Sequence, residues 1–239
     1  MTRPWTVLEH SPLQKLEDNL WEVEGAVPGF PMRRRMALIR LSDGSIVVHN
    51  AICLGEEAQR AVEAWGTVRY IVVPNPWHRL DAPAYAARYP DARVLCPRPA
   101  YRRATQVVRV DGNLDGLPAD TALTAEPLAG SRIDEHVFVV RSGERKTLVF
   151  GDTLMNNPKL PGFKGWAYGL TGSTSNGPVG KPMVTPLAKL VMVADRSSLR
   201  AHLERLAAAP GLERVLPGHG TMVEGGGAAA MLTEALASL

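Results

Sequence analysis

Short apolar runs alternate along this chain with segments whose apolar residues recur at helical spacing. The apolar runs at 36–41 and 45–50 flank Ser42-Asp43-Gly44, a turn sequence that predicts a β-hairpin. Residues 55–66 follow with small and apolar side chains on one helical face, which predicts an amphipathic helix. Residues 70–74 are continuously apolar, as expected of a strand that is buried on both faces.

The rest of the chain continues this alternation of strands and helices. The further predicted elements are a helix over 82–90, a strand over 92–97, a hairpin over 136–152 that turns at Ser142-Gly143, a helix over 197–208, a strand and turn over 213–220, and a helix from 226 to 239. Hairpins followed by βα units indicate an α+β or layered α/β chain in which helices cover sheets. No shift in composition marks a linker, so we predict one domain over residues 1–239.

Residues 155–182 lack a periodic pattern. They hold six Gly and four Pro in 28 positions, and we expect a long irregular loop there. Loops of this length are often lids over a site or disordered segments. Phe163, Trp166 and Tyr168 favour packing over disorder.

Composition and charge are those of an ordinary globular protein. Of the 239 residues, 45% are apolar and 21% are charged, and the formal net charge is +3. That excess of positive charge is too small to indicate nucleic acid, which we do not expect as a partner. The strongest basic cluster, Arg33–Arg35, is predicted to be a solvated surface.

The cysteines and the N-terminal residues bear on the compartment. Cys53 and Cys96 both lie in apolar surroundings and form no CxxC pair, so we expect buried free thiols, as in a reducing compartment. The first 21 residues are charged and hold no apolar core of a signal peptide, and no stretch reaches the roughly 18 apolar residues of a membrane span. We therefore expect a cytoplasmic protein with no membrane contact; the oligomeric state is left open.

Three side chains that can bind metal fall where predicted strands end: His78, Asp152 and His219. One carboxylate and two imidazoles are a suitable ligand set for Zn or Fe, with positions left for water. Each residue alone also has an ordinary explanation, since Gly-Asp and a lone His are common in turns. The sequence contains no GxSxG, GxxxxGK[ST] or GxGxxG, so serine-hydrolase and nucleotide-binding functions lack support.

The order of these features resembles the metallo-β-lactamase-fold superfamily. The most specific stretch is VLPGHG at 215–220, and LVFGDT at 148–153 supports it. The resemblance runs from the hairpin at 36–50 to the C-terminal helix, and it implies an αββα sandwich with a metal site at one edge between the sheets.

The best-known motif of that superfamily, His-x-His-x-Asp-His, does not occur in its usual form here. The corresponding stretch is VVPNPWHRLD, at 72–81. Counting back from Tyr89-Pro90, which resembles the end of the helix after the motif, sets the register. His78 then takes the place of the last His, Trp77 that of the Asp, Asn75 that of the second His and Val73 that of the first. The register stays open by a residue or more, because Asp81 is an alternative partner for the motif Asp.

The further His of the superfamily has no clear counterpart. The region where it would stand, at 126–140, contains no Pro-Gly-His-Thr-like turn, and His136 lies too far into the predicted strand. The resemblance therefore implies that the first metal position is lost, while a second position made of His78, Asp152 and His219 could hold a single ion. Pro74-Asn75 and His78 also resemble an uncharacterised branch with a Pro-Asn-x-x-His turn.

Two functions follow from the resemblance. The first is a hydrolase with one divalent ion, Zn or Fe, that acts on a small ester, lactone, amide or phosphoester that the sequence does not identify. No catalytic base is assigned, because the motif Asp is missing. The second is a non-catalytic binding or scaffold protein that has lost its metal site. The residues expected to line a substrate pocket are Asn75, Trp77, Arg79, Asn156, Asn157 and Trp166.

Overall fold

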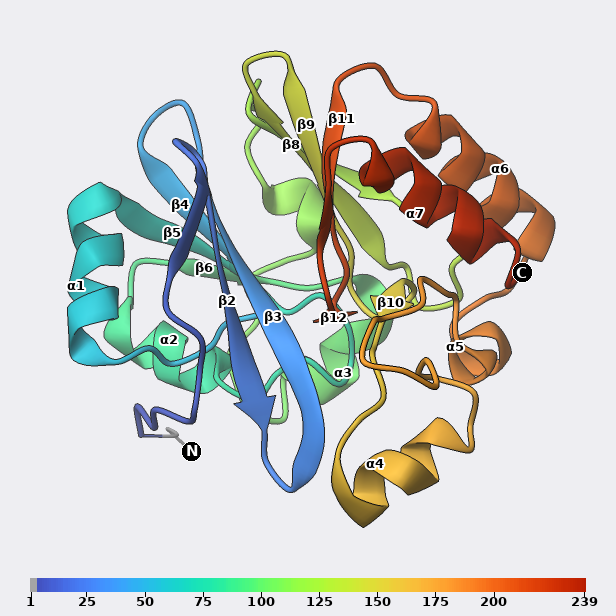
Figure 1. Ribbon diagram of the computed structural model, residues 1–239. Helices are drawn as coiled ribbons and strands as arrows, with labels where there is room; N and C mark the ends of the chain where they lie inside the picture. The colour runs from blue at the N-terminus through green and yellow to red at the C-terminus, as the bar shows by residue number, and fades with distance from the viewer. Residues whose placement is uncertain (1–3) are drawn as a thin grey trace. The chain divides into compact units, whose positions relative to one another are not determined.

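The computed structural model of the protein describes residues 4–239, which form two compact units (Figure 1). The first unit contains the described residues up to Gly25 together with Arg35–Ala125, and the second contains Ala26–Arg34 together with Glu126–Leu239. Each unit has its own hydrophobic core. One domain over residues 1–239 stays a prediction.

The first unit is built on a six-stranded sheet in the order β1-β2-β3-β4-β5-β6. The strands are β1 Gln14–Glu17, β2 Leu20–Val27, β3 Phe30–Arg40, β4 Ser45–His49, β5 Thr67–Val72 and β6 Arg93–Leu95. The predicted hairpin is confirmed, because β3 and β4 pair antiparallel. The pairs β4–β5 and β5–β6 are parallel, and a parallel pair needs a crossover connection. Helices α1 Glu56–Trp65 and α2 Ala82–Arg88 supply these crossovers.

Alternate side chains of the central strands build the core of the first unit. Leu38, Val48 and Ile71 are fully buried and pack with Val62 of α1 and Tyr85 of α2. The Tyr85 hydroxyl donates to the Ile52 carbonyl over 2.9 Å, so the polar end of this buried ring is satisfied. Helix α3 Tyr101–Ala104 adds Ala104 to the same core.

The second unit carries a five-stranded sheet in the order β13-β11-β9-β8-β7. Its strands are β7 Leu123–Pro127, β8 His136–Ser142, β9 Arg145–Val149, β11 Leu212–Leu216 and β13 Val223–Glu224. The predicted hairpin at 136–152 is confirmed: β8 and β9 are antiparallel and turn at Gly143, whose φ of +62° suits glycine. Strand β11 pairs parallel to β9. This parallel pair aligns the two strand ends that the sequence singled out.

Two helices cover this sheet and lie side by side in Figure 1, α6 Arg196–Ala207 and α7 Gly227–Leu236. Leu199 and Leu203 of α6 and Leu232 of α7 are fully buried in one core with Leu148 and Val215 of the strands. Both helices were predicted within a few residues of their observed ends.

The segment 155–182 is less irregular than predicted. It contains helix α4 Gly162–Gly169 and the short strand β10 Met155–Asn156, and helix α5 Pro186–Val191 follows. Glycine hides the helical pattern of α4, but a β-carbon at Gly165 would lie 2.5 Å from the Leu160 backbone, so a small residue is required there. The ring of Tyr168 meets Phe30 edge to face at 5.2 Å, as the prediction of packing requires, whereas Phe163 and Trp166 are 78% and 54% exposed.

The prediction that Arg33–Arg35 is a solvated surface is wrong for two of its three residues. Arg34 and Arg35 are 5% and 4% exposed. Arg35 donates to the buried Glu22 over 2.9 Å and also pairs with Glu24. Burial raises the pKa of Glu22, and the Arg35 guanidinium opposes that rise. The missed element was β2, whose carboxylates lie across from β3 and give the arginine a partner.

The two cysteines confirm the prediction of buried thiols outside any disulfide. Cys53 and Cys96 are each 1% exposed and are not linked to one another. Burial raises the pKa of Cys96 to about 11. Among residues 4–239, no helix has the length and apolar character needed to cross a membrane.

Candidate metal centre

Asp152 stands on a three-residue loop, Gly151–Thr153, that leaves the end of β9. It is 7% exposed. The backbone N–H groups of all three residues donate to the carboxylate of Glu135, at distances from 3.0 to 3.3 Å. The Thr153 hydroxyl donates to the same carboxylate over 3.0 Å. The buried side chain of Glu135 therefore holds the backbone of this loop in place.

Glu135 was not predicted as a functional residue. A single Glu before an apolar strand carries no pattern, and only the folded hairpin brings it under the Asp152 loop. Full burial and the nearby Asp152 carboxylate raise the pKa of Glu135, whereas the hydrogen bonds from Thr153 and Gly151 stabilise its ionised form and act against that rise.

His219 stands on the turn that follows β11. Phe150 N–H donates to the Leu216 carbonyl over 2.9 Å, and Gly218 N–H donates to the Gly151 carbonyl over 3.1 Å. A β-carbon at Gly218 would lie 2.2 Å from the Gly151 oxygen, so the two chain segments approach as closely as glycine permits. Strand β12, His219–Gly220, then pairs parallel to β10.

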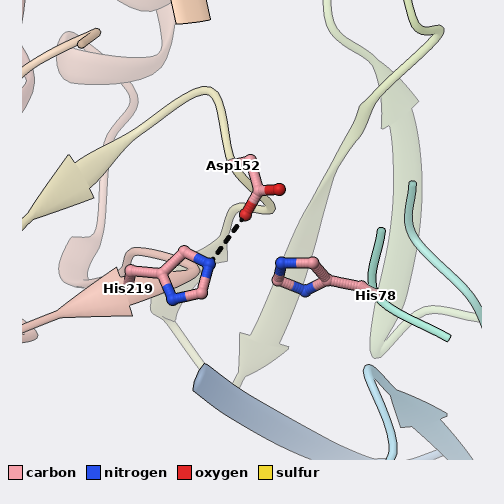
Figure 2. A group of neighbouring side chains, drawn as sticks. All are labelled: His78, Asp152 and His219. Carbon is pink, nitrogen blue, oxygen red and sulfur yellow. Dashed lines mark ion pairs between the residues drawn. The ribbon is translucent and has the colours of Figure 1, made fainter. Parts of the chain in front are cut away.

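The imidazole of His219 has a polar neighbour at each of its two nitrogens. Its Nδ1 lies 2.6 Å from the Arg33 carbonyl, and because a carbonyl only accepts, Nδ1 carries the hydrogen. Its Nε2 lies 3.0 Å from Asp152 Oδ1, the ion pair drawn in Figure 2. A backbone carbonyl on one nitrogen leaves the other nitrogen to bind metal, the arrangement that most metal-binding histidines show.

His78 stands on a turn between β5 and α2 in the first unit. The Asn75 side chain is fully buried, and its Oδ1 accepts from the N–H groups of Trp77 and His78 over 2.9 and 3.0 Å. This is an Asx-type turn, in which a short side chain closes its own backbone. Asp81, the alternative partner for the motif Asp, is 1% exposed and accepts from Cys53 N–H over 3.1 Å.

Asp152 and His219 belong to the second unit, where Asp152 Oδ1 and His219 Nε2 lie 3.0 Å apart, and His78 belongs to the first unit. Figure 2 shows these three side chains and marks the ion pair between Asp152 and His219. Two imidazole nitrogens and one carboxylate oxygen form a donor set that suits Zn²⁺ or Fe²⁺, and two of the three residues are buried. The residues present therefore fit a single divalent ion. His136 is not a member of this group; its Nδ1 lies 2.8 Å from the Asp134 carbonyl.

The residues predicted to line a substrate pocket differ in their surroundings. Trp77 and Trp166 are 46% and 54% exposed. Arg79 donates to the Arg103 carbonyl over 2.7 Å at the surface. Asn75 is committed to its own turn, as described above. Asn156 and Asn157 are buried; the Asn156 side chain donates to the Thr221 carbonyl over 2.7 Å and that of Asn157 to the Ser173 carbonyl over 3.5 Å. Substrate contact by these residues stays a prediction.

Solved metallo-β-lactamase structures share this architecture. The DIM-1 enzyme aligns over 98% of both chains with a TM-score of 0.60 and 12% identity. The enzyme from Pontibacter korlensis aligns over 96% of this chain and 98% of its own, with a TM-score of 0.56 and 14% identity. The enzyme from Hirschia baltica aligns over 96% of both chains, with a TM-score of 0.57 and 15% identity.

The chain has the metallo-β-lactamase fold. The predicted α+β class is thereby confirmed, since two sheets with their helices match these structures over nearly their whole length. No protein-family model matches the chain. No curated protein matches it either. At 12–15% identity the likeness concerns the fold, so the chemistry must be argued from the side chains.

Proposed function

We propose that the protein binds one divalent ion, Zn or Fe, through His78, Asp152 and His219 and hydrolyses a small ester, lactone, amide or phosphoester. The observation that carries this proposal is the pair of Asp152 and His219. The Arg33 carbonyl holds His219 Nδ1, and His219 Nε2 lies 3.0 Å from Asp152 Oδ1. His78 supplies the third ligand of the proposed set.

The roles of the three side chains follow from their chemistry. Two neutral imidazoles and one carboxylate leave a divalent ion with net positive charge, which favours an anionic or polarised substrate oxygen. When bound, such an ion supplies Lewis-acid polarisation and lowers the pKa of a water molecule. Arg33 contributes its backbone carbonyl, which keeps His219 Nε2 directed at Asp152. No side chain is assigned as general base.

A non-catalytic role is the second candidate, and the turn before α2 favours it. Where the superfamily motif would place a second His, the buried Asn75 instead closes the turn through two backbone hydrogen bonds. A first metal position built on that residue is therefore not available. A protein with one remaining position could bind a ligand without turning it over.

Metal analysis tests the proposed metal site. Protein purified without added metal should hold about one equivalent of ion per chain, because three ligands with a fixed outer shell bind metal tightly. The variant His219→Ala should lose the ion, and His136→Ala is the matched control, since His136 is a buried histidine of the same unit outside the group. A metal-free protein whose melting temperature does not change with Zn²⁺, Mn²⁺ or Fe²⁺ would overturn the proposal.

A panel of chromogenic esters, lactones and phosphodiesters then tests hydrolysis in the metal-loaded protein. Turnover that His219→Ala abolishes and His136→Ala retains supports the hydrolase. Metal binding without turnover on any of these substrates supports the non-catalytic candidate.

A further inference from the structure

Glu135 is a fully buried carboxylate, and the three ligand residues of the proposed centre do not include it. It precedes β8 directly, and its two oxygens receive four donor groups from Gly151, Asp152 and Thr153. Burying a carboxylate is costly unless its acceptor sites are filled. The burial of Glu135 is therefore best explained by the backbone groups that its oxygens hold in place.

We propose that Glu135 is a positioning residue for the metal centre, which fixes the backbone on either side of Asp152 so that its side chain meets His219. This inference rests on the proposed function. The central contact is the Asp152 N–H itself, which donates to Glu135 Oε2 over 3.2 Å. Glu135 holds the backbone N–H of Asp152, and the side chain of Asp152 lies against His219 Nε2.

Only a carboxylate meets the requirements of this position. Every group that the loop presents to Glu135 is a donor, and a carboxylate is an acceptor at both oxygens. The amide of a glutamine would accept at one end and direct its own N–H groups at the backbone donors on the other. One or more buried N–H groups of the loop would then lose their partner.

The fit between Glu135 and the loop is also close in space. A β-carbon at Gly151 would lie 3.0 Å from the Glu135 carboxyl carbon, so glycine is needed where the loop crosses the acid. Gly151 in turn accepts from Gly218 N–H, which belongs to the turn that carries His219. Glu135 thus braces a backbone chain that connects both ligand residues of the second unit.

A Co²⁺ titration followed by visible absorption tests this inference. The variant Glu135→Gln should bind Co²⁺ roughly 10- to 100-fold more weakly than the wild type, with an altered d–d spectrum, because outer-shell partners have effects of this size. Leu203→Ala is the control: it deletes buried side-chain volume in α6 and should lower the urea midpoint of unfolding while leaving the Co²⁺ affinity unchanged.

The outcomes separate this inference from the proposed function. Wild-type protein that binds no Co²⁺ defeats the proposed function and the inference with it. Wild-type affinity in Glu135→Gln, with the wild type binding normally, overturns the role of Glu135 alone. Equal weakening in Leu203→Ala also overturns it, since the effect would then follow stability.

A milder variant keeps the test decisive if Glu135→Gln does not fold. Thr153→Val removes one of the four donor groups and keeps the side-chain shape. It should weaken Co²⁺ binding by about threefold to tenfold, an effect no larger than the loss of one hydrogen bond to a charged group. Unchanged affinity in this variant would overturn the inference.

Discussion

Asp152 and His219 stand on the ends of two paired strands, whereas His78 stands on a local turn, and different contacts hold the two regions. The strand-end region is fixed by residues distant in sequence: Glu135 under the loop, Arg33 on the imidazole, and Gly218 against Gly151. The turn region is fixed mainly by Asn75, which lies three residues from the histidine that it positions.

This difference predicts how each region responds to mutation. A change in the strand-end region should disturb the geometry of two ligands together and should affect the second unit widely. A change in the turn region should stay local, because its hydrogen bonds span two or three residues. The contrast can be tested through both the metal affinity and the free energy of unfolding.

The largest effect is expected from Asp152→Asn. The substitution keeps the shape of the side chain and removes its charge, so the affinity for Zn²⁺ should fall by more than about 100-fold, beyond the loss of an outer-shell partner. Competition with a chromogenic chelator measures it. If the Asp152→Asn variant binds Zn²⁺ as tightly as the wild type, the strand-end region is not the anchor of the site.

Gly218→Ala should have the next largest effect. Its β-carbon would lie 2.2 Å from the Gly151 oxygen, and the forced separation of the two segments should lower the free energy of unfolding by about 3 kcal/mol. Urea unfolding measures the change. Gly177→Ala is the control, since a β-carbon there meets no atom within 4 Å, and its effect should stay below about 0.5 kcal/mol. Equal losses of unfolding free energy in the two variants would contradict the close approach of Gly218 to Gly151.

Asn75→Ala should have a smaller and more local effect. The substitution removes the Oδ1 acceptor of two backbone N–H groups in the turn. This loss should lower the free energy of unfolding by about 1–2 kcal/mol. The Zn²⁺ affinity should fall less than in Asp152→Asn, because the strand-end ligands stay in place. If Asn75→Ala lost as much Zn²⁺ affinity as Asp152→Asn, the turn would contribute as much to metal binding as the strand ends do.

Trp77→Ala and Trp166→Ala should have the smallest effects on stability. Both side chains are about half exposed, so the free energy of unfolding should change by less than about 0.5 kcal/mol. If these residues line the substrate site, kcat/KM should fall while metal content stays at the wild-type level. An unchanged kcat/KM on a substrate that the protein hydrolyses would end that prediction.

The sequence predicted the strand-end region better than the turn region, for a physical reason. Apolar runs that stop at Gly-Asp and Gly-His mark strand ends, and a parallel pair such as β9–β11 brings those ends to one edge. Glu135 and Arg33 could not be found this way. Their roles depend on contacts across 17 and 186 residues, and neither contact leaves a local pattern.

The same limit explains the errors in the fold. The pairing of Arg35 with Glu22 needs β2 beside β3, and β2 was not recognised. Helix α4 was missed because its glycines break the apolar spacing that identifies a helix, and one of them, Gly165, is required by close packing at Leu160.

The central claim is that His78 joins Asp152 and His219 on one metal ion. A crystal structure of the Zn²⁺-loaded protein, with anomalous data at the zinc edge, tests it most directly. We expect one anomalous peak per chain, with a nitrogen of each histidine and an Asp152 oxygen within about 2.0–2.2 Å of it. A peak bound by Asp152 and His219 without His78, or no peak at this position, would contradict it.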